Sequence, residues 1–333
     1  MLSLHYEARL GLARGAIYRD GLPHLYMEGY EFDPSPGVLG TRSVARVTGA
    51  AGGVRFIVLA DSTEAVLDAP QGAKLTDGAA VEVEIIAEAR RGKRVRAAYA
   101  GPAEGAPRRL SKAVSLKDRL VERAAGLIGG TVMEVKADRD RLDDARDQAL
   151  NPSGALKGGG DLAIEATRGL IACDVDAGGE GGLQTPRAHA RACNERAVAD
   201  LPRRLRLSNL AGLVVVDLIG QRHDGEVLRR LLLDNFAAEA ARIVVAPIGR
   251  FGTLECVRPW GAHPLYAASP LAVAVDLTWR AIELSEQDAG RPIAVRATAD
   301  VLDLLRPLRA ASLDPMVPML RLEESSRLET VYA

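Results

Sequence analysis

Two stretches of sequence decide the fold: Gly169-Leu-Ile-Ala-Cys-Asp174-Val-Asp176 and Leu213-Val-Val-Val-Asp217-Leu-Ile-Gly220. Each is a run of apolar residues that ends in acid. Apolar runs of this length are typical of strands buried within a sheet. A Gly-rich loop, residues 177–182, follows the first run. We therefore expect two strands whose acidic ends meet at one edge of a sheet.

The acids at these strand ends suit a hard-cation site. Asp174 and Asp176 are two residues apart, so a regular strand points both to the same face. If the two strands are neighbours, Asp217 completes a three-carboxylate cup. Mg²⁺ bound in this way keeps positions open for water and a phosphate, as phosphodiester hydrolysis requires. The alternative is that these are ordinary aspartates at turns, where Asp is favoured, and spacing alone does not decide between the two.

Length and charge limit the choice of function. The chain has 333 residues, which predicts two to three domains. Hydrophobic residues make up 47% and aromatic residues only 4%, so Ala, Leu and Val must form most of the cores. Lys and Arg number 43 against 44 for Asp and Glu, so the whole chain does not attract nucleic acid by its net charge. An RNA or DNA site must be a local patch.

The cysteines and the N-terminus indicate the compartment. Cys173, Cys193 and Cys256 are far apart and form no Cys-x-x-Cys pair, which argues against a zinc site and a disulfide framework. The N-terminus lacks a basic region followed by an apolar signal segment, and no run approaches the length of a membrane span. We expect a cytoplasmic, reduced protein without a membrane partner.

Residues 42–99 predict a small β-barrel. Five short strands in this stretch are separated by Gly-rich turns, which favours a closed barrel of the OB type. Such barrels bind single-stranded nucleic acid by aromatic stacking and a basic groove. The alternative for the basic residues is a solvated hairpin end. The candidate RNA-binding residues of the barrel are Phe56, Arg90, Arg91, Lys93 and Arg94.

Strands and helices alternate from 162 to 257, which predicts an α/β layer. Helices are also expected at 116–127 and 138–150 before this stretch, and at 274–286 and 299–308 after it. Within it, helices are expected at 187–206, with Pro202 as a potential interruption, and at about 224–241. The basic helix 187–206 supplies four further RNA-binding candidates: Arg187, Arg191, Arg203 and Arg204.

Three segments together resemble the bacterial ribonuclease E/G family. Residues 160–178 resemble the family's strand-turn-strand that enters the catalytic site. Residues 205–219 resemble the segment with the second catalytic aspartate, and residues 241–255 resemble the closing strand with its Arg-Phe-Gly turn. The three segments come in the family's order and at similar spacing. The resemblance is clear over about residues 155–260.

The resemblance implies a multidomain chain of the α+β and α/β classes. A ribonuclease-H-like subdomain would contain an inserted OB-type barrel, followed by a deoxyribonuclease-I-like α/β catalytic subdomain and a small C-terminal α/β domain. The expected boundaries are 1–38 and 112–160 for the ribonuclease-H-like parts, 39–101 for the barrel, 161–268 for the catalytic subdomain and 271–333 for the C-terminal domain.

The resemblance also assigns residues. Asp174 and Asp217 match the family's magnesium-binding aspartates. Asp176 stands where the family usually has Asn, so it keeps an oxygen, adds a charge and loses the amide donor. Asn194 matches an Asn of the intervening helix, whereas Arg196 stands where Glu is expected. The resemblance therefore implies Mg²⁺ as the cofactor, with Asp174, Asp217 and Asp176 as metal-binding and catalytic residues.

The implied function is a magnesium-dependent endoribonuclease that cuts single-stranded RNA, whether rRNA or mRNA, to 5′-phosphate and 3′-hydroxyl ends. Arg250 and Phe251 would grip the RNA near the site, although a core position for Phe251 and a carboxylate partner for Arg250 are equally good alternatives. The family's segment that recognises a 5′-monophosphate is replaced by a short linker at about 101–115, so we expect no sensing of the 5′ end.

The expected oligomer also differs from the family. Its zinc-binding Cys-x-x-Cys link is missing after residue 265, so no zinc-linked tetramer is expected. The flat edge of the C-terminal strand offers a surface that a homodimer could bury.

Two other functions compete with the nuclease. The chain could be a non-catalytic RNA-binding or ribosome and RNA-maturation factor on a decayed nuclease scaffold. Against decay stand three acids at metal positions, because crowded carboxylates are costly without a cation. A phosphohydrolase of small nucleotides is less favoured, because the dipeptide His223-Asp224 lacks the partner ligands of a metal hydrolase.

Overall fold

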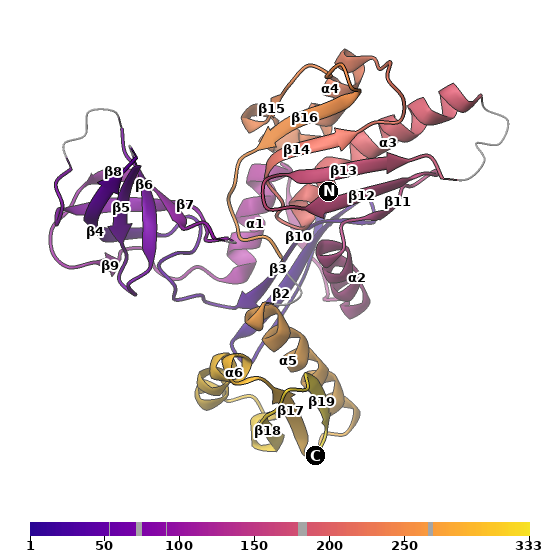
Figure 1. The fold of residues 1–333 in the computed structure, drawn as a ribbon. Helices are drawn as coiled ribbons and strands as arrows, with labels where there is room; N and C mark the ends of the chain where they lie inside the picture. Colours follow the sequence, from indigo (N-terminus) through magenta and orange to yellow (C-terminus); the bar gives the residue numbers. More distant parts are fainter. Residues whose placement is uncertain (53, 71–74, 91, 179–184, 266–268) are drawn as a thin grey trace. The chain divides into compact units, whose positions relative to one another are not determined.

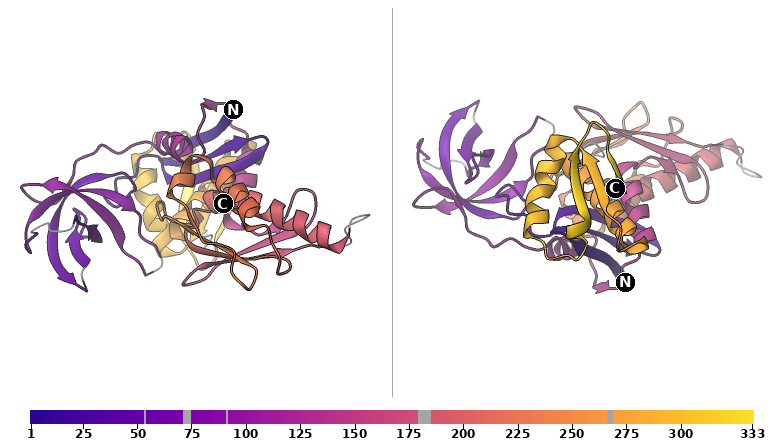
Figure 2. Two further views of the ribbon diagram at one scale, coloured as in Figure 1. Left: turned by 90° about the horizontal axis from the view of Figure 1, so that it is seen from above. Right: turned by 90° about the horizontal axis from the view of Figure 1, so that it is seen from below.

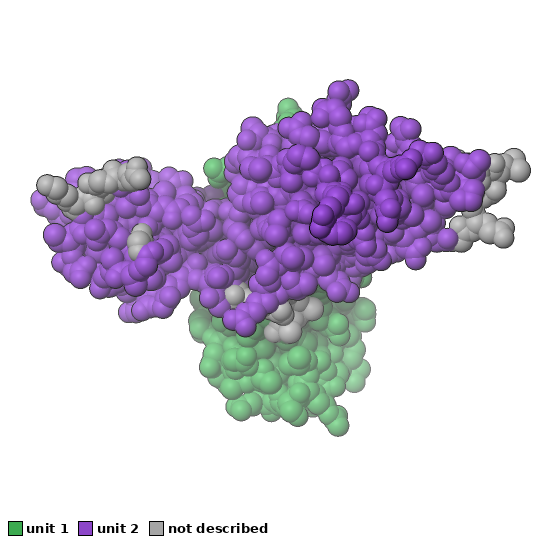
Figure 3. Space-filling view, turned by 45° about the horizontal axis from the view of Figure 1, so that its top comes forward, with its two compact units in different colours: residues 1–32, 115–150, 265–333 green, residues 33–114, 151–264 purple. Residues whose placement is uncertain are grey.

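The computed structural model describes residues 1–52, 54–70, 75–90, 92–178, 185–265 and 269–333. The chain divides into two compact units, shown in Figure 3. Unit 1 comprises residues 1–32, 115–150 and 265–333, and unit 2 comprises residues 33–114 and 151–264. The chain therefore passes through each unit more than once, while the finer subdomain boundaries stay predictions.

The first part of unit 1 is a four-stranded sheet in the order β10-β1-β2-β3 (Figure 1). Leu4, Ile17 and Leu25 of this sheet pack with Leu120 of helix α1. Helix α1 was predicted at 116–127 and is confirmed there, because Ser115 caps its first turn. The elements are β1 (Leu2–Arg9), β2 (Leu12–Arg19), β3 (Leu22–Tyr30), α1 (Leu116–Leu127), β10 (Val132–Glu134) and α2 (Arg139–Leu150).

The C-terminal part of unit 1 is a three-stranded sheet in the order β18-β17-β19 with two helices. Its core includes Val275, Ile282, Val295 and Leu302. The last strand, β19, was not predicted from the sequence because it is short and largely polar. The elements are α5 (Pro270–Gln287), β17 (Ile293–Ala297), α6 (Ala299–Ala311), the 3₁₀ turn η2 (Val317–Met319), β18 (Leu320–Glu324) and β19 (Glu329–Tyr332). The homodimer suggested for the C-terminal strand edge stays a prediction.

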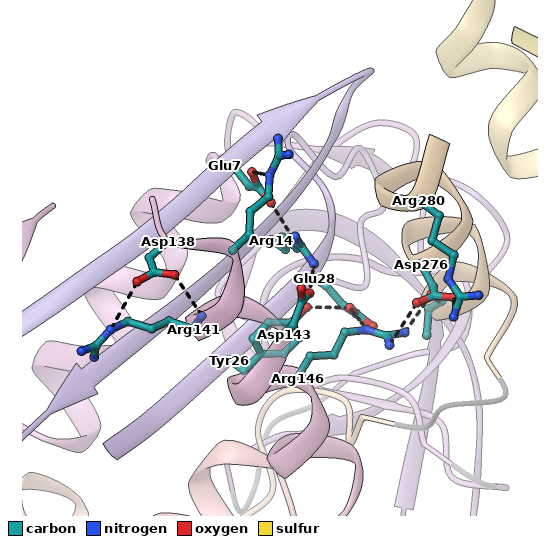
Figure 4. A network of polar contacts seen from close by, with 12 residues as sticks. Glu7, Arg14, Tyr26, Glu28, Asp138, Arg141, Asp143, Arg146, Asp276 and Arg280 are labelled. Carbon is teal, nitrogen blue, oxygen red and sulfur yellow. Dashed lines mark hydrogen bonds and ion pairs between the residues drawn. The ribbon is translucent and has the colours of Figure 1, made fainter. Parts of the chain in front are cut away.

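A charged network joins the elements of unit 1, as Figure 4 shows. Arg14 is buried and donates from Nε to Glu7 at 2.7 Å. Arg146 of α2 donates to Glu28 of β3 at 3.0 Å and forms an ion pair with Asp276 of α5 at 3.3 Å. These acids are neutralised by arginines, so the network ties helix α5 to the sheet through α2.

The first part of unit 2 is a closed five-stranded barrel, as predicted. Its strands follow the order β5-β6-β8-β7-β4, and β5 also pairs with β4 to close it. Val47, Ile57, Val83 and Ala97 lie in its core. The short strand β9 pairs with β4 at the margin. The strands are β4 (Arg42–Ala51), β5 (Val54–Val58), β6 (Glu64–Asp68), β7 (Ala80–Ala87), β8 (Val95–Pro102) and β9 (Arg108–Arg109). The OB-type assignment stays a prediction.

The second part of unit 2 is a six-stranded sheet in the order β11-β12-β13-β14-β16-β15. Helices α3 and α4 cover one face of it (Figures 1 and 2). Cys173, Val214, Leu201 and Leu232 lie in the core between the helices and the sheet. The elements are β11 (Gly154–Ala155), β12 (Asp161–Ala166), β13 (Ile171–Asp176), α3 (Pro186–Leu207), β14 (Gly212–Asp217), α4 (Gly225–Phe236), the 3₁₀ turn η1 (Ala237–Arg242), β15 (Val244–Val245) and β16 (Thr253–Arg258).

The helix predicted at 187–206 is confirmed as α3, from Pro186 to Leu207, and Pro202 lies inside it without interrupting it. The helix expected at 224–241 ends at Phe236, where Ala237 takes a positive φ of 54° and the chain continues as a 3₁₀ turn.

Candidate functional site

The two acidic strands are neighbours, and their acids lie side by side. Strands β13 and β14 are parallel and pair Asp174 with Asp217 in register. On β13, Cys173 and Val175 are buried against the helices, whereas Asp174 and Asp176 are exposed on the opposite face. Neighbouring strands are about 4.8 Å apart. The prediction that the acidic strand ends meet at one edge of the sheet is confirmed.

A pocket of about 300 Å³ opens at this edge. Asp174, Asp176 and Asp217 all line it, together with the chain that follows each strand. Ala177 contributes from the end of β13, and Ile219 contributes from the end of β14. The pocket therefore lies at the ends of the two strands that carry the acids.

Asp176 stands beside the in-register pair Asp174 and Asp217. Within the ranges that the structure describes, no three Asp, Glu, His or Cys side chains converge to hold a metal ion. Asp176 lies two residues beyond Asp174, which is about 6.5 Å along a strand. Its Oδ1 accepts a hydrogen bond from the backbone N–H of Gly178 at 2.8 Å. Asp174 and Asp217 are therefore the acids that pair across the two strands, and the role of Asp176 as a third metal ligand stays a prediction.

The pair fits a hard divalent cation. Mg²⁺ in proteins is commonly held by one or two carboxylates, with water and substrate phosphate completing its shell. Asp161 adds to the acidic character of this face, because it pairs with Asp176 across β12 and β13. Carboxylates gathered in this way repel one another unless a cation neutralises them. Asp161 was not predicted as part of the site, although its place at the start of a strand next to β13 was a usable signal.

The cysteines of the sheet do not belong to the site. Cys173 and Cys256 point into the core, where burial raises the pKa of each thiol to about 12. Thiols in this state are neither nucleophiles nor soft metal ligands at neutral pH. The donors at the pocket are therefore oxygen atoms.

The Arg-Phe-Gly turn adjoins the acids. Thr253 at the start of β16 pairs in register with Asp217, and the turn comes directly before it. Gly252 has a φ of +86°, and a Cβ atom there would meet the carbonyl oxygen of Gly220 at 2.8 Å, so the turn requires glycine. Phe251 is 73% exposed and the guanidinium of Arg250 lies 4.7 Å from its ring centre. The alternative that Phe251 is a core residue is therefore wrong.

The arginines of α3 divide into two groups. Arg187 and Arg191 near the start of the helix are exposed, and Arg191 pairs with Glu195 at 2.7 Å. Arg203 and Arg204 near its end are buried and both bind Asp200. Arg204 also donates to backbone carbonyl groups of residues 152, 154, 155 and 162. The prediction that Arg203 and Arg204 bind RNA does not fit this burial, because the protein itself takes up their donors.

The barrel brings one predicted aromatic and one predicted arginine together. The guanidinium of Arg94 lies 5.4 Å from the ring centre of Phe56, and its Nε donates to Glu64 at 2.7 Å. Lys93 is exposed next to this pair. Glu64 offsets part of the positive charge of Arg94. The ring of Phe56 and the guanidinium of Arg94 nevertheless lie close together on the barrel.

A second predicted arginine of the barrel, Arg90, has an aromatic partner outside it. The guanidinium of Arg90 stacks on Trp260 at 4.1 Å, so it contacts the segment that follows β16. Gly212, at the start of β14, also lies against this indole, since a Cβ atom there would meet Trp260 Nε1 at 3.1 Å. Arg91 lies outside the described residues.

No helix in the described part of the chain is both long and apolar enough to cross a membrane. The profile of the Ribonuclease E/G family matches residues 131–260. Ribonuclease E of Nostoc sp. is 33% identical over 128 residues, which are 38% of this chain and 19% of that protein. Ribonuclease E of Escherichia coli is 31% identical over 121 residues, which are 35% of this chain and 11% of that protein. The chain thus spans a fifth or less of the length of these relatives.

Proposed function

We propose that this chain, which belongs to the ribonuclease E/G family through its residues 131–260, is a divalent-cation-dependent endoribonuclease that cuts single-stranded RNA. The observation that carries the proposal is the in-register pair Asp174 and Asp217, which lines an open pocket inside the matched segment. The oxygen-only donor set supports Mg²⁺ as the cation.

The residues of the pocket have separate tasks in this proposal. Asp174 and Asp217 would hold the cation, and the Asp176 oxygen not bound to Gly178 would orient water at the rim. Bound Mg²⁺ supplies positive charge that neutralises the scissile phosphate and makes a water molecule more acidic. Attack by water on phosphorus breaks the bond to the 3′ oxygen, which leaves a 5′-phosphate and a 3′-hydroxyl.

RNA would be held at two places of unit 2. In the barrel, Phe56 and Arg94 offer a stacking surface for a base, with Lys93 beside them for a phosphate. Near the acids, the exposed pair Arg250 and Phe251 offers a second stacking surface. Arg187 and Arg191, which are exposed at the start of α3, would contact further phosphates of the same RNA. Binding through such cations weakens as salt rises.

The test is cleavage of an A/U-rich single-stranded RNA with Mg²⁺. Wild-type protein should yield fragments with 5′-phosphate ends, and Asp217→Asn should not. Asp234→Asn is the matched control, because Asp234 is an exposed acid of α4 away from the pocket. RNA binding measured in EDTA should be the same for all three proteins. Intact RNA despite normal, salt-sensitive binding would favour the alternative of a non-catalytic RNA-binding factor.

We also propose that cutting does not depend on the 5′ end of the RNA. Strand β8 ends at Pro102 and α1 begins at Leu116, with only the two-residue strand β9 between them. A linker of this length has no room for a separate phosphate-binding segment. Two RNAs that differ only in a 5′-monophosphate or a 5′-hydroxyl should be cut at equal rates. A large preference for the monophosphate would contradict this part of the proposal.

A further inference from the structure

A buried asparagine of α3 holds the chain directly after Asp217. Asn194 is 2% exposed. Its Nδ2 donates to the carbonyl oxygen of Ile219 at 3.1 Å, and its Oδ1 accepts from the N–H of Ile219 at 3.0 Å. Both polar atoms of one side chain therefore bind both polar groups of one backbone residue.

This pair of hydrogen bonds needs an amide side chain. Strand β14 ends at Asp217, so the sheet ladder no longer pairs the residues that follow. Buried backbone N–H and C=O groups without partners are costly. Only Asn and Gln present a donor and an acceptor side by side. Asn194 thus replaces the missing strand partner of Ile219 from beneath the sheet.

The held residue belongs to the pocket. Ile219 lies two positions after Asp217 and forms part of the pocket wall. The same helix also holds the end of the other acidic strand, because His189 Nε2 lies 3.1 Å from the carbonyl oxygen of Ala177, another lining residue. Helix α3 is therefore bonded to both chain segments that leave the acidic strands.

We propose that Asn194 is a positioning residue that keeps Asp217 aligned with Asp174 for cation binding. The inference rests on the proposed function, since it concerns the same pocket. Without the bridge, the chain after Asp217 loses both of its anchoring hydrogen bonds to α3. The carboxylate of Asp217 then samples orientations that do not share a cation with Asp174. Residues that orient metal ligands typically change metal affinity by about 10- to 100-fold when they are replaced.

The test uses the full chain, Mn²⁺ as the cation and no RNA. Asn194→Ala should bind Mn²⁺ about tenfold or more weakly than wild type by paramagnetic resonance titration. Asn235→Ala is the matched control, because this helical Asn donates to Leu231 within α4 and should leave the affinity unchanged. Far-ultraviolet circular dichroism and RNA binding in EDTA should stay at wild-type values. Wild-type Mn²⁺ affinity in a folded Asn194→Ala variant would overturn the inference alone.

A second measurement, amide hydrogen exchange, can be made on the wild-type protein and so does not depend on a variant that folds. The amide hydrogen of Ile219 should exchange slowly in the metal-free wild-type protein, although it lies outside the strand. Exchange at the rate of an unstructured chain would overturn the inference. Asn194→Ser, which is too short to make both bonds, should lose this protection and weaken Mn²⁺ binding. Failure of the wild-type protein to bind Mn²⁺ at all would instead remove the metal site of the proposed function, and the inference with it.

Discussion

The two faces of the β11–β16 sheet use charged residues in opposite ways. On the helix-covered side, Glu239 is buried and bound by Arg206 at 3.3 Å and by Arg258 at 3.0 Å. On the open side, Asp174 and Asp217 are exposed and make no ion pair within the described residues. Acids that have arginine partners stabilise this fold. Acids that face one another without such partners are available to a cation that the protein does not itself supply.

The largest expected effect is the loss of cleavage when an acid of the open face is replaced. Asp174→Asn removes one charge of the cation-binding pair without disturbing a core contact. Cleavage should fall about a thousandfold or more, since metal-ion stabilisation of the reacting phosphate is worth several kcal/mol. The free energy of unfolding, measured by urea denaturation, should change by less than about 0.5 kcal/mol. Unchanged cleavage by this variant would mean that the pair is not the active centre.

On the helix-covered face, replacing an acid should lower stability and leave cleavage unchanged. Glu239→Gln leaves Arg206 and Arg258 buried without their counter-charge. The free energy of unfolding should fall by about 3–5 kcal/mol, as when one partner of a buried ion pair is removed. Burial already lowers the pKa of Arg206 to about 10, so further loss of its acid is poorly tolerated. Cleavage per folded molecule, measured well below the unfolding midpoint, should stay near the wild-type rate.

The free energy of unfolding should also depend on pH through Asp200, an acid that has arginine partners. Burial raises the pKa of Asp200, but the hydrogen bonds and charges of Arg203 and Arg204 outweigh burial and lower it. A depressed pKa contributes stability above the unfolded value of about 3.9, and this contribution is lost as the pH falls through the folded value. The free energy of unfolding should therefore fall below about pH 4. Asp200→Asn should lessen that slope, whereas Asp234→Asn should keep it.

The smallest effect concerns the exposed arginines of α3. Arg187→Ala should weaken RNA binding uniformly across sequences. It should lower the slope of log Kd against log salt by about 0.7, the value for one phosphate contact on a single strand. Fluorescence anisotropy at several salt concentrations measures this slope. Arg203→Ala should instead lower stability, and equal salt slopes for Arg187→Ala and wild type would remove Arg187 from the RNA-binding surface.

Local chemistry explains what could be predicted from the sequence. Helix 116–127 was predicted to the residue because its apolar positions repeat with helical period. The structure adds Ser115 as its N-cap. The two apolar runs predicted buried strands with acidic ends, but their adjacency was only a condition of the predicted site, which the pairing of β13 with β14 meets. Within unit 2, the five barrel strands also followed from their period and turns.

Predictions that depended on tertiary partners did worse. Arg203 and Arg204 have the same sequence signature as exposed arginines, and only the neighbouring Asp200, three and four residues before them, hinted at an internal ion pair. The three-acid cup stays a prediction, because the three acids line one pocket and Asp176 also accepts a hydrogen bond from Gly178. Asn194 matched a family residue, but its hydrogen bond to Ile219 depends on where α3 lies relative to the chain that follows β14.

The most direct test of the central claim is the cation dependence of cleavage by the wild-type chain. The protein is stripped with EDTA, and Mg²⁺ is then added in steps while cutting of a single-stranded RNA is followed. The wild-type chain should not cut in EDTA, its rate should rise and saturate with Mg²⁺, and Asp217→Asn should show no such rise. Equal cutting in EDTA and in Mg²⁺, or a rise that survives in Asp217→Asn, would contradict it.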